Sequence, residues 1–76
     1  MQMNRIYQIK YEEKWSGCRE WLPDSTNVLA NGDAQKAVDK VKRQSLTKSY
    51  KAEDTGKVQK CVAFRLREVS MLAEAS

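Results

Sequence analysis

The sequence predicts a small α+β domain, in which one helix packs on one face of an antiparallel sheet of three to four strands. Two stretches, one near each end of the chain, alternate apolar and polar residues as strands do. Between them lies a segment with helical periodicity that follows a helix-capping residue. With 76 residues the chain has room for a single domain, 1–76, in the order β-β-α-(β)-β.

The first predicted strand covers 4–15. Its residues Tyr7, Ile9 and Tyr11 share one face, which Glu13 interrupts. Period-2 alternation of aromatic and β-branched residues with polar ones is typical of a half-buried strand. We therefore expect one face of this strand to lie in the core.

A second strand is expected after the turn Ser16-Gly17-Cys18. Pro23 and Asp24 interrupt it, and proline cannot donate a hydrogen bond to a strand ladder. This strand is therefore expected at an edge of the sheet or at a bulge. The stretch 26–30 completes it, and the first two strands form a hairpin.

The helix is predicted from Ala34 to about Ser45 or Leu46, with Asp33 as its N-cap. At 100° per residue its small apolar side chains fall on one stripe, together with Ser45. That stripe consists of Ala34, Ala37, Val38, Val41 and Ser45. The basic residues Lys36, Lys40 and Arg43 lie on the opposite side of the helix.

The polar stretch 47–57 holds a turn signal at Asp54-Thr55-Gly56, preceded by a candidate short strand over 49–52. The last strand is predicted over 57–69, and 70–76 is expected to be a frayed, flexible tail. In that strand Val58, Val62, Phe64 and Leu66 face one way, and Cys61, Ala63, Arg65 and Arg67 face the other. The predicted core is Tyr7, Ile9, Tyr11, Val28, Ala37, Val38, Val41, Val62, Phe64 and Leu66.

The composition argues against catalysis and against cofactors. The chain has no histidine and only two cysteines, so histidine-based catalysis and a four-ligand zinc site are not expected. Glu12 and Glu13 are neighbours on a strand and point to opposite faces, so they cannot act as an acid–base pair. We expect no enzyme, no metal and no cofactor. Spacing alone leaves open whether Cys18 and Cys61 form a disulfide, with reduced thiols favoured.

The sequence also bears on location. No apolar run approaches the length of a transmembrane helix, and the first residues lack the apolar region of a signal peptide. We therefore expect a cytoplasmic protein with no membrane partner.

A cationic middle is the first candidate functional feature. Residues 36–51 contain six basic residues and one acidic residue, a net charge of +5 against +4 for the entire chain. Lysine and arginine side chains bind phosphates and release counterions, so such a surface suits nucleic acid. The alternative is an ordinary solvated helix face, to which helix C-terminal cations contribute.

The open face of the sheet is the second candidate. Lys10, Arg65 and Arg67 are expected to project from it, with Cys61 and Ala63 between the basic residues. Arginine is enriched where proteins bind proteins, so this face suits a protein partner. No aromatic residue is expected on the outer face of the last strand, so base stacking is poorly supported. The alternative is ordinary polar sheet surface.

Two tryptophans form the third candidate. Trp15 and Trp21 flank the predicted turn between the first two strands. Both can cap the end of the core, or one can stand exposed as an anchor for a partner.

The layout resembles small orphan proteins of bacteriophages and prophages. The resemblance rests on an opening aromatic strand (5–11), a Trp-Leu-Pro-Asp segment (21–24), an alanine-containing helix start (33–38) and a closing strand (62–69). Some proteins of this layout are anti-CRISPR proteins, which implies a host effector complex as partner. The basic cluster departs from the acidic inhibitors that mimic DNA.

From these features we expect a non-enzymatic interaction protein of phage or prophage type, located in the host cytoplasm. It would dock on a host protein or nucleoprotein complex that handles nucleic acid, an anti-CRISPR inhibitor being the sharpest version. The alternatives are a small basic protein that binds DNA or RNA through phosphates, and a homodimer formed by edge-strand pairing. The candidate binding residues are Lys36, Lys40, Arg43, Lys48, Arg65 and Arg67.

Overall fold

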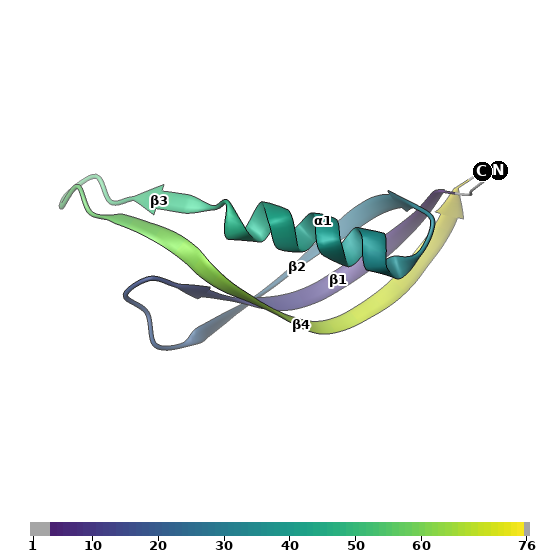
Figure 1. Ribbon diagram of the computed structural model, residues 1–76, viewed down its shortest axis with the longest axis horizontal. Helices are drawn as coiled ribbons and strands as arrows, with labels where there is room; N and C mark the ends of the chain where they lie inside the picture. Colours follow the sequence, from purple (N-terminus) through teal and green to yellow (C-terminus); the bar gives the residue numbers. More distant parts are fainter. Residues whose placement is uncertain (1–3, 76) are drawn as a thin grey trace.

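The computed structural model describes residues 4–75 as four antiparallel strands and one helix (Figure 1). The elements are β1 (Asn4–Trp15), β2 (Trp21–Asn31), α1 (Ala34–Leu46), β3 (Ser49–Lys51) and β4 (Val58–Ala75). The strands form one sheet in the order β2-β1-β4-β3, and α1 packs on one face of it. The predicted fold class and element order are confirmed.

β1 and β2 form the predicted hairpin, and β1 has the predicted bounds, 4–15. β1 is central, because it pairs with β2 on one side and with β4 on the other. The turn contains Gly17 at φ 79°, a left-handed conformation that glycine adopts without strain. β2 passes through Pro23 and forms one edge of the sheet, where a missing N–H group is tolerated.

The helix begins and ends as its capping residues predict. The Asp33 carboxylate Oδ1 accepts a hydrogen bond from the backbone N–H of Lys36 at 3.2 Å. Thr47 ends the helix, and its Oγ1 donates to the carbonyl oxygen of Gln44 at 2.8 Å. The buried face of the helix carries small side chains, which let the helix lie close to the sheet. These buried residues are Ala37, Val38, Val41 and Ser45.

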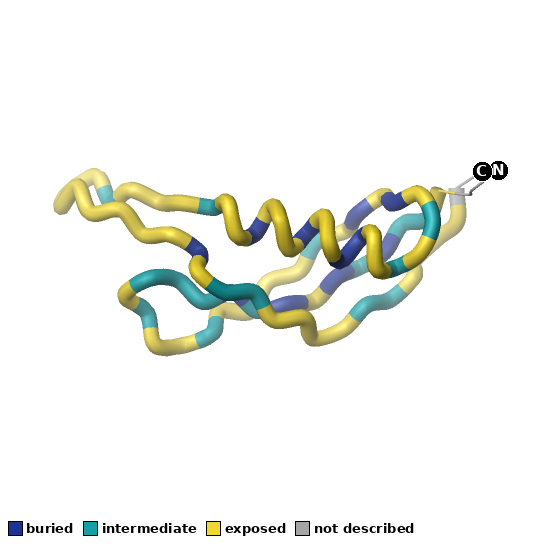
Figure 2. The backbone as a smooth tube through the Cα atoms, viewed as in Figure 1, coloured by how far each residue is buried: buried dark blue, intermediate teal, exposed yellow. Residues whose placement is uncertain are grey.

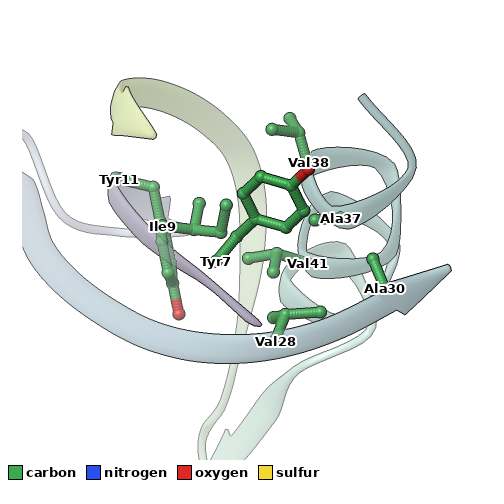
Figure 3. Close-up of a cluster of buried hydrophobic side chains, with 8 residues drawn as sticks. All are labelled: Tyr7, Ile9, Tyr11, Val28, Ala30, Ala37, Val38 and Val41. Carbon is green, nitrogen blue, oxygen red and sulfur yellow. The ribbon is translucent and has the colours of Figure 1, made fainter. Parts of the chain in front are cut away.

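The hydrophobic core lies between α1 and the middle of the β1–β2 hairpin. Its buried members are Tyr7, Ile9, Tyr11, Val28, Ala30, Ala37, Val38 and Val41 (Figure 3). Ile9 is completely buried, and the Tyr11 ring stacks on Phe64 with ring centroids 5.2 Å apart. Seven of the predicted core residues are therefore buried, and Phe64 packs against them partly exposed.

The last strand departs most from the prediction. β4 does not end at Val69 but continues to Ala75, and residues 70–75, apart from Leu72, pair with β1 instead of forming a frayed tail. Ser76 lies outside the described residues. The extra length is explained by β1, whose first residues offer a free ladder of N–H and C=O groups. The ends of the described chain meet as a result, since Asn4 lies opposite Ala75 (Figure 1).

Three register shifts in the β1–β4 ladder change which side chains of β4 reach the core. Val62, Arg67 and Leu72 have no counterpart on β1, as in β-bulges, and each extra residue breaks the alternation of faces. Val62 is therefore 58% exposed, contrary to the prediction, and Cys61, expected on the outer face, is buried. Leu66 faces the helix side but is 43% exposed, so it does not belong to the core either.

The molecule is elongated, with extents of 50 × 20 × 15 Å. Most residues of β3 and β4 are exposed, whereas buried residues gather under α1 (Figure 2). Tyr50 of β3 has an exposed fraction of 60%, which places it on the surface. Cys18 and Cys61 are both free thiols.

The pairing of residues 70–74 predicts slow amide hydrogen exchange in this segment. The N–H groups that point to β1 are hydrogen-bonded in a ladder, whereas those of the turn 53–56 are mostly open to water. Exchange measured by NMR is expected to be protected at those residues of 70–74 whose N–H groups point to β1. Exchange at the rate of the 53–56 turn throughout 70–74 would show that this segment is frayed.

Candidate functional site

The outer side of α1 carries an exposed row of cations, which we call the cationic stripe: Lys36, Lys40 and Arg43. Their spacing of four and three residues places them on one side of the helix, one per turn. Within residues 4–75, no carboxylate lies within ion-pair distance of any of the three. The one acidic side chain of the helix, Asp39, accepts a hydrogen bond from Gln35 Nε2 at 2.9 Å. The stripe is therefore a row of charges without counter-charges.

The packing of α1 fixes the direction of the stripe. Ala37 and Val41 are almost completely buried against the sheet, at 0% and 2% exposure. A helix held on that side cannot rotate without removing these residues from the core. The three cations are therefore held toward solvent before any partner arrives.

Lys48, the fourth predicted site residue, is used inside the structure. Its Nζ lies 2.8 Å from Oε2 of Glu13 and 3.7 Å from Oδ2 of Asp24, and it contacts the Tyr11 hydroxyl oxygen at 3.5 Å. The Glu13 side chain is only 6% exposed. Ser45 Oγ donates a second hydrogen bond to the same Glu13 oxygen at 2.5 Å. Lys48 is thus the counter-ion of a buried carboxylate and is not a free cation.

Protonation of this cluster follows from its contacts. Desolvation alone would lower the pKa of Lys48, but the hydrogen bond and the charge of Glu13 outweigh it, and the pKa is raised above 10.5. Burial raises the pKa of the Tyr11 hydroxyl above 10.0, against the opposing charge of Lys48. At neutral pH Lys48 is therefore a cation, which cannot act as a nucleophile.

The arginines of β4 lie on the other side of the sheet and are also paired. Arg65 donates from Nε and Nη2 to Oε1 of Glu12, at 3.0 and 2.7 Å, and its guanidinium lies 4.3 Å from the Trp21 ring centroid. Arg67 Nη1 is 3.6 Å from the same oxygen. On this face Lys10 lies 3.7 Å from Glu68. The open sheet face is therefore a network of mixed charges rather than a basic patch.

The six predicted binding residues therefore do not form one site. The structure brings Lys36, Lys40 and Arg43 together on the helix, assigns Lys48 to a buried network, and places Arg65 and Arg67 on the opposite face. The buried network itself was missed by the sequence analysis. The sequence did contain a sign of this network. Glu13 interrupts the apolar face of β1, Ser45 interrupts the apolar stripe of α1, and these two faces pack against each other.

The two tryptophans have different surroundings. Trp21 is half-buried on the open face, and the Arg65 guanidinium lies over its ring. Lys14 Nζ lies 6.0 Å from the centroid of the same ring. Trp15 borders a shallow hollow of ≈ 490 Å³ at the turn end of the sheet. The hollow is lined by Trp15, Gly17, Cys18, Leu22, Tyr50 and Gln59.

Comparison with known proteins found no matching family model, curated protein or solved structure. Within residues 4–75, no helix has the length and apolar character needed to cross a membrane. In the same residues, no three metal-binding side chains gather at one place.

Removal of the Lys48 charge is expected to destabilise the fold. In Lys48→Met the Glu13 carboxylate stays buried with Ser45 as its one close partner. We expect the free energy of unfolding to fall by about 1–3 kcal/mol, less than for a fully buried pair because Lys48 is partly exposed. Urea unfolding followed by tryptophan fluorescence measures this change.

Lys51→Met is the matched control, because Lys51 is exposed on β3 and the same charge is lost. It is expected to change the free energy of unfolding by less than about 0.5 kcal/mol. Equal effects of the two substitutions would contradict the assigned role of Lys48.

The raised pKa values of Lys48 and Tyr11 predict a loss of stability at alkaline pH. Both groups hold their protons more tightly in the folded than in the unfolded chain. Their contribution is complete below pH 10 and is lost as the pH rises through the folded-state pKa values. Urea unfolding from pH 8 to 11.5 should show this decline, and Lys48→Met should remove the part of it that comes from Lys48 itself. An unchanged decline in the variant would contradict the prediction.

Proposed function

We propose that this chain is a non-enzymatic interaction protein whose cationic stripe docks on a polyanionic surface of a complex that handles nucleic acid. The observation that supports the proposal is the contrast between the two sides of the molecule. Lys36, Lys40 and Arg43 have no ion-pair partner within residues 4–75, whereas Arg65 and Arg67 share Glu12. Charges without counter-charges are the ones available to a partner.

The character of α1 favours recognition of charge over recognition of sequence. The helix contains no aromatic residue, so it offers no surface on which a base could stack. The helix backbone that carries these cations is fixed by its buried side, so binding does not have to order this backbone. Phosphate groups or clustered carboxylates both suit such a row.

The resemblance in layout to phage and prophage proteins points to a sharper version of this proposal. In that version the partner is a CRISPR effector of the bacterial host, and the stripe lies against the nucleic acid that the effector holds or against an acidic surface of one of its subunits. The basic helix suits a protein that contacts the bound nucleic acid itself or an acidic subunit surface, because lysine and arginine side chains are attracted to phosphates and carboxylates.

Direct binding to DNA or RNA is the second candidate function, and the length of the basic surface favours it. α1 and β3 follow each other along the long axis of the molecule (Figure 1). Lys42 is also exposed on α1, and exposed lysines continue past the stripe at Lys51, Lys57 and Lys60. A linear polyanion could follow such a track, with contacts to phosphates and little sequence preference.

Affinity capture from host-cell lysate, with and without nuclease, distinguishes the two candidates. Proteins that stay bound after nuclease treatment, identified by mass spectrometry, would support docking on a protein surface. Retention that disappears with nuclease would favour direct binding to nucleic acid. If the triple variant Lys36→Gln, Lys40→Gln and Arg43→Gln captured the same partners equally well, the proposed role of the stripe would be wrong.

The triple variant Lys36→Gln, Lys40→Gln and Arg43→Gln is expected to lose at least about tenfold in affinity for the captured partner, because three exposed charges are removed. If the partner is duplex DNA, the slope of log K against log salt should fall by roughly 2 to 3. Binding titrations at several salt concentrations measure both quantities, and far-UV circular dichroism checks the fold.

The matched control replaces Arg19, Lys57 and Lys60 by Gln, which removes the same charge from exposed positions away from α1. A protein partner held by the stripe should bind this control normally. If a nucleic acid follows the longer track, the control should weaken binding as well. Full affinity of the stripe variant would refute the proposal.

A further inference from the structure

One edge of the sheet has no partner strand along most of its length among the residues that the structure describes. β3 pairs only with Val58–Lys60 of β4, and the last backbone bond on that side runs from Cys61 N to the carbonyl oxygen of Lys48, at 3.1 Å. From Val62 to Ala75 no strand among residues 4–75 pairs with the side of β4 that faces away from β1. We call this segment the free edge. Its outward N–H and C=O groups form a template for a further strand.

The two edges of the sheet differ in how they are protected. β2 carries Pro23 and Asp24, which hinder pairing with another chain. The free edge contains neither proline nor lysine. It also exposes large apolar side chains: Val62, Leu66, Met71 and Leu72, with exposed fractions of 58%, 43%, 54% and 50%. A run of exposed apolar residues along an edge that lacks a partner strand among residues 4–75 is a feature of an interface.

The charges along the free edge indicate which strand fits it. Its first half carries Arg65 and Arg67, and its second half carries Glu68 and Glu74. A parallel copy would place like charges side by side. An antiparallel copy places the basic half of each strand beside the acidic half of the other, and cross-strand pairs of opposite charge are stabilising. The free edge is therefore complementary to itself.

We propose that two copies of this chain form a dimer by antiparallel pairing of their free edges, around a two-fold axis close to Arg67 and Glu68. In this arrangement Arg67 of each copy lies beside the partner's Glu68. The extra residue at Arg67 lies on the axis, so both strands have the same local bend there. The two sheets join into one continuous sheet.

The dimer explains the exposed apolar residues on the helix side of β4. Leu66 and Met71 lie opposite the buried Tyr11 and Tyr7 of β1, so they share the face that α1 covers. A two-fold axis perpendicular to the sheet places both helices on this same face. Leu66 and Met71 of both copies then lie between the two helices, shielded from water.

Sedimentation equilibrium over a hundredfold range of protein concentration tests this proposal without any other partner. The expected result is a reversible monomer–dimer equilibrium. A monomer throughout that range, or an assembly that grows beyond a dimer, would overturn the proposal.

Charge reversal tests the orientation. Arg67→Glu places like charges beside each other twice in the dimer and is expected to raise the dimer dissociation constant roughly tenfold. Glu68→Arg has the same effect, and the double variant, which exchanges the two charges, restores dimerisation. Arg19→Glu makes the same change of charge in the turn between β1 and β2, where Arg19 is exposed, and is expected to leave the dimer unchanged. If the double variant dimerised no better than either single one, the pairing of Arg67 with Glu68 would be refuted.

A pair of leucine substitutions tests the location. Leu72→Lys introduces a charge on the free edge and is expected to weaken the dimer by at least about tenfold. Leu29→Lys is the control, because Leu29 is a similarly exposed leucine on β2, at 54%. Circular dichroism shows whether both variants keep the fold. A dimer that Leu29→Lys dissociates and Leu72→Lys leaves intact would place the interface on β2 and refute the proposal.

Discussion

The buried carboxylate of Glu13 is the constraint on which the arrangement of the elements depends. It belongs to the central strand, and its charge is met by Ser45 from the end of α1 and by Lys48 from the segment that follows. Cys61 at the start of the free part of β4 lies 3.4 Å from Ser45. An unpaired buried charge costs several kcal/mol. A helix displaced by one turn would incur that cost, so this cluster fixes the position of α1 and the path into β3.

This use of Lys48 shapes the charge distribution of the whole molecule. The cations that lie nearest to carboxylates form ion pairs. Lys48 pairs with the buried carboxylate of Glu13, and Arg65 pairs with Glu12 on the open face of the sheet. Among the described residues, the outer side of α1, whose inner side is fixed in the core, carries cations without counter-charges. The modest net charge of +4 is thus unevenly distributed, with the helix side cationic and the sheet side balanced. Long-range attraction of an anionic partner would act mainly on the helix side.

The spacing of apolar residues along the sequence predicted an element well where pairing with its neighbours leaves that spacing unchanged. The alternation in β1 and the 100° spacing in α1 survive folding, so their bounds and buried faces followed from the sequence. In β4 the extra residues at Val62, Arg67 and Leu72 arise from pairing with β1, and no local pattern reveals them. The stripe on α1 was predictable for the same reason as the helix. The pairing of Lys48 and Arg65 was not, because it depends on which strands become neighbours.

Asn4 of β1 and Ala75 of β4 are paired, so the two ends of the described chain lie side by side. A short linker between these ends would make the backbone a loop without a free end. Opening that loop at the exposed turn 53–56 would give a circular permutant in which every strand and the helix stay continuous. The order of the elements along the chain would then begin with β4 and end with β3. Such a permutant would keep the same elements as neighbours in space while it changes the order in which they are translated.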